Sequence, residues 1–171
     1  MTLSTVGALF VVGVLIHNAE EAFFLPAWSA RAKKWHPVVA PRHFAFAVLA
    51  LSALLLACAV GALVAGPGSV WAYLFSGYVF AMVANAVLPH FAATLATRSY
   101  MPGMATGLLL NAPLGAWFLT QAVESRFVQP RILLWVAPAV AVALALSIPV
   151  LFRLARAALP ANPDIERRRA G

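Results

Sequence analysis

Residues 12–25 read Val-Gly-Val-Leu-Ile-His-Asn-Ala-Glu-Glu-Ala-Phe-Phe-Leu, an apolar run that contains one histidine and two adjacent glutamates. A run of this kind predicts a helix that crosses a membrane, with His17, Glu20 and Glu21 inside it. An ionisable group costs roughly 3 kcal/mol at the centre of a bilayer on insertion scales. Three such groups within five residues therefore indicate that the protein uses them.

The whole chain has the composition of a membrane protein. Of its 171 residues, 63% are hydrophobic and 10% are charged, whereas soluble domains carry about 25% charged residues. The net charge of +7 does not indicate nucleic-acid binding, because the Lys and Arg residues lie between and after apolar runs, where they orient membrane helices. A single cysteine, Cys58, excludes a disulfide framework and a cysteine-based metal site. The N-terminus lacks the positive region of a cleaved secretory signal, so we expect the first apolar segment to be retained.

The predicted fold class is all-α, a polytopic membrane bundle of five transmembrane helices. Apolar runs of about the 20 residues that a bilayer requires lie at 4–26, 44–65, 70–95, 103–123 and 132–152. Turn-forming residues separate the runs, and Pro89 predicts a kink in the third helix. These boundaries predict one transmembrane domain over 1–153 and a basic, disordered cytoplasmic tail over 154–171.

The charges of the connections predict the orientation of the bundle. Of the twelve Lys and Arg residues, all but Arg126 and Arg131 fall on one side, in the first and third connections and in the tail. The positive-inside rule then places the N-terminus outside and the C-terminus in the cytoplasm. We expect anionic lipid head groups to bind at the basic inner loops.

Polar side chains from three predicted helices fall at a similar depth in the cytoplasmic half of the bundle. With a rise of 1.5 Å per residue, Glu20 and Glu21 lie about 10 Å from the inner end of their helix. By the same rise His90 lies about 8 Å, and Asn111 about 13 Å, from the inner ends of theirs. Glu20 and Glu21 lie on either side of His17, at the i+3 and i+4 positions, where a carboxylate and the imidazole can bind one ion.

The candidate metal ligands are His17, Glu20, Glu21 and His90. Nitrogen and carboxylate donors without thiolates suit a divalent metal, Zn²⁺ or Fe²⁺. Two histidines and one glutamate, with a second glutamate free, are the groups of a metallohydrolase, in which the spare carboxylate takes a proton from water. The same ligands suit a mononuclear non-haem iron oxygenase. It stays open which glutamate is ligand and which is base, and whether His36 or His43 joins the site.

Three elements follow one another along the chain: His17-Asn18-Ala19-Glu20-Glu21, then His90, then Tyr100-Met101-Pro102-Gly103. Together they resemble the HXXEE family of small bacterial integral membrane proteins, whose pattern is H-x-x-E-E, a second histidine and Y-x-P-G. The resemblance covers about residues 17–103. It implies a functional site and a location in the bacterial cytoplasmic (inner) membrane, but no reaction, because the family has no assigned function.

Five further residues are predicted to support the site. Tyr100 is expected either to donate a hydrogen bond to a substrate oxygen or to anchor the chain at the membrane interface. Arg98 either pairs with a carboxylate or head group, or only orients the helices. Gly103 allows close approach of backbone or substrate. Asn85 and Asn111 either contact the substrate and the ligands or join the helices.

The leading interpretation is an integral-membrane metal-dependent enzyme, first a Zn-type hydrolase acting on a lipid or lipophilic small molecule near the cytoplasmic leaflet. Its catalytic residues would be Glu20, Tyr100 and Arg98. Three alternatives remain: a non-haem iron oxidoreductase, a proton- or cation-coupled carrier in which Glu20 and Glu21 share a proton, and a membrane scaffold with a structural polar cluster. Five helices without an inverted repeat match common carriers poorly. A homo-oligomer, which the sequence permits, would remove this objection.

Overall fold

The computed structural model of the chain describes residues 1–159, and its regular structure over those residues is entirely helical. The elements are, in chain order, α1 (Leu3–Arg31), α2 (Pro41–Ala65), α3 (Val70–Asn85), η1 (Ala86–Phe91), α4 (Ala92–Thr97), α5 (Met104–Thr106), η2 (Gly107–Asn111), α6 (Ala112–Glu124) and α7 (Pro130–Ala158). The element η2 is a single π-helical turn, whereas η1 is a kinked junction between α3 and α4.

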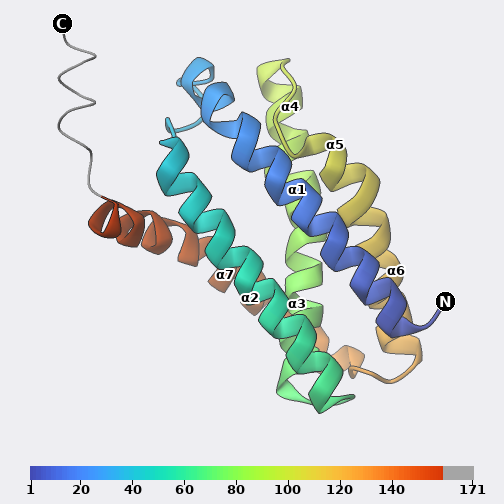
Figure 1. Cartoon of the computed structure of the whole chain (residues 1–171). Coiled ribbons are helices and arrows are strands. Elements are labelled where there is room, and N and C mark those ends of the chain that lie inside the picture. The colour runs from blue at the N-terminus through green and yellow to red at the C-terminus, as the bar shows by residue number, and fades with distance from the viewer. Residues whose placement is uncertain (160–171) are drawn as a thin grey trace, which may run out of the picture.

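These elements form five helical rods, because η1 and α4 continue α3 while α5 and η2 lead directly into α6 (Figure 1). The α1–α2 and α4–α5 connections lie at one end of the bundle, at the top of Figure 1, and the other two connections lie at the opposite end. The predicted five-helix bundle is confirmed.

Four of the rods are long and apolar enough to cross a membrane by length and composition. They are Leu3–Arg31, Pro41–Ala65, Val70–Thr97 and Pro130–Ala158. The remaining rod, α5–η2–α6, covers the predicted span 103–123 and falls outside those four. A π-helical turn divides it into a three-residue and a thirteen-residue α-helix.

Two helices extend past their predicted ends. Helix α1 passes Pro26 and ends at Arg31, and helix α7 ends at Ala158. The first five residues of the predicted tail, 154–158, are therefore helical. Leucine, arginine and alanine fill them, and these are strong helix formers that let the preceding helix propagate. The rest of the predicted tail, 160–171, lies outside the described residues.

The third rod is interrupted where the sequence predicts a kink. Leu88 has non-helical backbone angles, with φ −129° and ψ 112°, and Pro89 follows it. Proline has no N–H to donate and disfavours the helical conformation in the residue before it. The segment η1 spans this break and packs against the π-helical turn η2. The side chain of His90, directly after Pro89, is buried by this arrangement.

An aromatic core packs the end of the bundle where the chain begins. The ring centroids of Phe75 and Phe118 lie 5.0 Å apart, and those of Phe10 and Phe75 lie 6.3 Å apart, in edge-to-face contacts. Small residues bring the helices close: a Cβ on Gly115 would lie 2.5 Å from Cγ2 of Val83. This core occupies the first half of α1, which leaves the second half, with its ionisable residues, to a polar site.

Candidate metal centre

The centre of the polar site is a pair of buried histidine rings. His17 of α1 is 0% exposed and His90 of η1 is 1% exposed. Their ring centroids lie 5.0 Å apart, and the two planes are nearly perpendicular, at 89°. The kink at Pro89 therefore brings together two histidines that are far apart in the sequence.

The carboxylate of Glu21 faces both rings. Its Oε1 lies 3.1 Å from Nε2 of His90, and its Oε2 lies 3.8 Å from Nε2 of His17. One ligand atom from each of the three residues lies within 4.8 Å of the other two. The structure thus brings together three of the four predicted ligands, from α1 and η1.

The chemistry of these donors fits a divalent metal ion. Nδ1 of His90 is buried without a hydrogen-bond partner within residues 1–159, and the contact of the buried Nε2 there is the one with the Glu21 carboxylate. Buried nitrogens without partners are costly unless something binds them. Two imidazole nitrogens and one carboxylate are the donor set of several catalytic zinc sites, which keep a fourth position open. The same set is the facial triad of non-haem iron enzymes.

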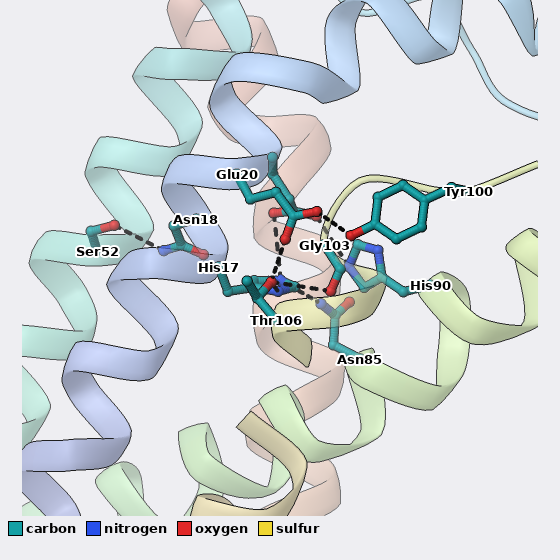
Figure 2. A network of polar contacts seen from close by, with 10 residues as sticks. His17, Asn18, Glu20, Ser52, Asn85, His90, Tyr100, Gly103 and Thr106 are labelled. Carbon is teal, nitrogen blue, oxygen red and sulfur yellow. Dashed lines mark hydrogen bonds and ion pairs between the residues drawn. The ribbon is translucent and has the colours of Figure 1, made fainter. Parts of the chain in front are cut away.

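Glu20 points to different partners from those of Glu21. Its Oε1 accepts a 2.5 Å hydrogen bond from the hydroxyl of Tyr100, and its Oε2 accepts a 2.7 Å bond from the hydroxyl of Thr106. Figure 2 shows Glu20 lying next to Tyr100 and Thr106. The two adjacent glutamates therefore serve separate groups of side chains, as their positions on either side of His17 allow.

A chain of hydrogen bonds links Glu20 to the histidine pair. The Thr106 hydroxyl lies 3.1 Å from Nδ1 of His17 (Figure 2). A hydroxyl has one proton, and here Thr106 donates it to Glu20, so Nδ1 of His17 must carry a hydrogen and donate to Thr106. This assignment leaves the lone pair on Nε2, which faces Glu21. The amide nitrogen of Asn85 lies 3.5 Å from the same Nε2.

Tyr100 lies in the connection between the third and fourth rods and keeps its proton. Partial burial raises the pKa of Tyr100, and the hydrogen bond to Glu20 raises it further. The backbone N–H of Ala105 donates a 3.2 Å bond to the same hydroxyl oxygen. Tyr100 is thereby a donor to Glu20 at neutral pH.

Gly103 holds the backbone against the edges of both histidine rings. A Cβ at this position would lie 2.7 Å from Cε1 of His90 and 2.9 Å from Cε1 of His17. Its φ of +91° is also a conformation that other residues rarely adopt. Both the backbone angle and the contact therefore require glycine here.

Two of the predicted supporting residues lie away from this cluster. Arg98 is exposed at the end of α4, with φ +50°, and within residues 1–159 no hydrogen bond or ion pair joins its side chain to the site. Asn111 is buried, and its Oδ1 lies 3.4 Å from the position of a Cβ on Gly13, about one helical turn before His17. Both of its polar side-chain atoms lack a hydrogen-bond partner within the described residues.

The two remaining histidines also have other partners. Nδ1 of His36 lies 2.7 Å from the carbonyl oxygen of Pro37, and Nε2 of His43 lies 3.3 Å from that of Leu159. Neither belongs to the group of close ligand atoms.

Sequence reasoning missed Thr106 and Asn18. Thr106 follows Gly103 by three residues, so helical spacing alone places it above the glycine on the same face. Asn18, inside the H-x-x-E-E motif, donates a 2.9 Å hydrogen bond to the hydroxyl of Ser52 and so fastens α1 to α2 (Figure 2). No local pattern predicts that second contact.

A separate cavity borders each glutamate. The Glu20 cavity has a volume of about 900 Å³, and its lining includes Glu20, Trp28, Arg31, Lys34, Trp35 and Tyr100. The Glu21 cavity has a volume of about 850 Å³, and its lining includes Glu21, His90 and apolar residues of α2, α3 and α7. Two of the three converging residues, Glu21 and His90, therefore border a mainly apolar cavity.

Comparisons with known proteins identify the family of the chain. The chain is 33% identical over 147 residues to the uncharacterized protein YrkK of Bacillus subtilis (strain 168), an alignment that covers 86% of this chain and 93% of the relative. No solved structure matches the chain. The family described as "Protein of unknown function with HXXEE motif" matches residues 8–118, a range that includes every residue of the histidine and glutamate cluster. The chain belongs to the HXXEE family, and His17, Glu20 and Glu21 are its motif.

Proposed function

We propose that this protein is a metal-dependent membrane enzyme, a hydrolase that binds Zn²⁺ between His17, His90 and Glu21. The observation that carries the proposal is the convergence of their ligand atoms to within 4.8 Å of one another. Three protein ligands are typical of catalytic zinc sites, whereas structural sites have four. Hydrolysis is placed first because it needs no reactant besides the substrate and water.

The contacts support a division of roles between the two glutamates. Glu21 faces both imidazoles and is the ligand, while Glu20 holds the ring of His17 through the hydroxyl of Thr106. Carboxylates that orient a histidine ligand in this way fix its tautomer and raise its basicity. Glu20 is thus a positioning residue in this proposal, and not the general base. Its different partners also give no support to proton sharing with Glu21.

A bound zinc ion would supply a Lewis acid and a water nucleophile at neutral pH. The chain's own residues would hold that ion in a site closed on one side by the backbone of Gly103. The opening lies toward the Glu21 cavity, whose lining contains both Glu21 and His90. A substrate in that cavity would reach the ligands directly.

The site is proposed to lie in the cytoplasmic half of the membrane. The end of α1, the start of α2 and the end of α4 lie at the end of the bundle nearest the site, and there or in the α1–α2 connection are Arg31, Lys33, Lys34, Arg42 and Arg98. Arg153 and Arg156 belong to the same end, because Leu159 after α7 contacts His43 of α2. Arg126 and Arg131 lie at the α6–α7 connection, at the other end. The positive-inside rule places the more basic end in the cytoplasm. A lipid or lipophilic small molecule of the inner leaflet is then the proposed substrate.

The experiment that tests this function uses the purified protein in nanodiscs. Element analysis is expected to find stoichiometric zinc, and hydrolysis of p-nitrophenyl decanoate is expected to stop with a chelator and return with added Zn²⁺. Restoration by Fe²⁺ alone would favour the iron alternative. Absence of bound metal in the wild type, or unchanged metal in a His17→Ala/His90→Ala double variant, would contradict the proposal.

Replacing Thr106 with valine is expected to weaken zinc binding by about 10–100-fold, the usual effect of losing a partner of a metal-ligating histidine. The substitution keeps the shape of the side chain but leaves Nδ1 of His17 and the carboxylate of Glu20 without their shared hydroxyl. Competition with a chromophoric chelator measures the affinity. Thr106→Ser keeps the hydroxyl and is the matched control. Equal affinities of the valine and serine variants would show that the hydroxyl does not position the histidine.

A further inference from the structure

The Glu21 cavity has an apolar wall and a basic mouth. Its lining from α7 consists of Ala141, Leu144, Ala145, Ile148, Pro149, Phe152, Arg153 and Arg156. These residues follow the i, i+3, i+4 spacing of a single helix face. Helix α7 runs behind α2 in Figure 1 and contacts its first turn at the C-terminal end, where Phe152 stacks on Phe44 with ring centroids 6.3 Å apart, and this face lines the cavity between the two helices. The apolar face ends in two arginines.

The length of this face suits one acyl chain. From Ala141 to Arg153 the helix rises about 18 Å, against about 15 Å for half of the hydrocarbon core of a bilayer. Leu51 and Val48 of α2 and Ala81 of α3 line the opposite wall. A hydrocarbon chain could therefore lie along α7 with its polar end beside Arg153.

The charges at the mouth of the Glu21 cavity determine which kind of head group a bound amphiphile would carry. Arg153 and Arg156 are exposed, and neither forms an ion pair with a residue in the described part of the chain. Of the described residues that line the cavity, Glu21 is the one acidic residue, and it faces the histidines. Arginine binds phosphate and carboxylate groups with two parallel hydrogen bonds. The mouth is thus suited to an anion.

We propose that the Glu21 cavity binds a single-chain amphiphile with an anionic phosphate or carboxylate head group. The head group pairs with Arg153 and Arg156, the chain lies along the apolar face of α7, and Glu21 and His90 border the chain between those two ends. The binding of this amphiphile is inferred from the cavity alone. Its role as the substrate rests, in addition, on the proposed function.

The test measures binding of dodecyl phosphate to the full-length protein in dodecyl maltoside by native mass spectrometry. Inorganic phosphate and dodecanol, each offering one half of the ligand, form the other two arms. We expect dodecyl phosphate to bind at least 10-fold more tightly than either. Inorganic phosphate binding as tightly as dodecyl phosphate would overturn the proposal, because the apolar face would then contribute nothing.

Two pairs of variants locate the binding. The double variant Arg153→Gln/Arg156→Gln is expected to weaken dodecyl phosphate binding at least 10-fold. The control Arg31→Gln/Lys34→Gln removes two charges from the Glu20 cavity and is expected to bind dodecyl phosphate like the wild type. Ala145→Phe narrows the cavity and is expected to weaken binding, whereas Ala143→Phe changes an exposed position outside its lining. Equal dodecyl phosphate affinities of the Arg153→Gln/Arg156→Gln and Arg31→Gln/Lys34→Gln variants would overturn the proposal.

Zinc content, measured in the same samples, separates this inference from the proposed function. Bound zinc without dodecyl phosphate binding would overturn the amphiphile site and leave the metal site standing. Dodecyl phosphate binding that depends on Arg153 and Arg156, in a protein that takes up no zinc, would support the amphiphile site and contradict the proposed hydrolase.

Discussion

Replacing His90 with alanine is expected to reduce zinc affinity by more than about 100-fold, beyond the 10–100-fold typical of residues that only support a ligand. The variant removes one of the three residues whose ligand atoms converge. It also leaves the carboxylate of Glu21 without the ring nitrogen that lies 3.1 Å away. Titration of the purified protein with Zn²⁺ against a chromophoric chelator measures the change.

His43→Ala is the matched control for this variant. It removes an imidazole from the same end of the bundle, but His43 contacts the carbonyl of Leu159 and lies outside the converging group. Zinc affinity is therefore expected to stay at the wild-type value. A folded His90→Ala variant, with wild-type helicity by circular dichroism and wild-type zinc affinity, would favour a purely structural polar cluster.

Replacing Gly103 with alanine is expected to lower the free energy of unfolding by about 2–5 kcal/mol and to disrupt the metal site. A positive φ costs a residue with a Cβ about 1–2 kcal/mol. The new methyl group would also meet two buried imidazole rings at 2.7 and 2.9 Å, and overpacking of this kind costs typically 1–3 kcal/mol. Moving either ring would change the distances between the ligand atoms.

The chain contains a control that isolates the contact from the backbone strain. Gly68 also has a positive φ, +74°, but a Cβ there would have no heavy atom within 4 Å. Gly68→Ala is expected to cost only the conformational part, about 1–3 kcal/mol, and to bind zinc normally. Reversible unfolding in mixed micelles compares the two variants. Equal costs, with unchanged zinc affinity in Gly103→Ala, would mean that the backbone of Gly103 does not hold the histidines.

The fold was largely predictable from the sequence, because apolar runs of bilayer length and proline positions are local signals. The kink at Pro89 follows from the missing N–H of one residue. The π-helical turn η2 was not predicted, since its extra residue per turn depends on packing between rods. The end of α7 was placed too early because an alanine-rich segment can continue a helix beyond the apolar run.

The site was predictable in part. His17, Glu20 and Glu21 share one helix, so spacing alone placed the two carboxylates on either side of the imidazole. Depth along the helices also suggested His90 and Asn111 as site residues. The structure brings His90 next to His17 and Glu21, whereas Asn111 lies against Gly13. Depth carries no information about the direction in which a side chain points around its helix.

The different roles of Glu20 and Glu21 were not predictable from the sequence, because they depend on contacts between distant segments. The hydroxyl of Thr106 joins Glu20 to His17, although 86 residues separate it from Glu20. This contact, and the one between Tyr100 and Glu20, give the two glutamates different partners. Adjacent glutamates look equivalent in a sequence, and only packing of the fourth rod against α1 distinguishes them.

The central claim is that His17, His90 and Glu21 bind one metal ion, and anomalous diffraction from crystals of the zinc-loaded protein tests it most directly. A single strong peak is expected at the zinc edge, about 2.0–2.2 Å from Nε2 of each histidine and from a carboxylate oxygen of Glu21. An absence of any peak between these three residues at saturating zinc, or a peak bound instead by His36 or His43, would contradict it.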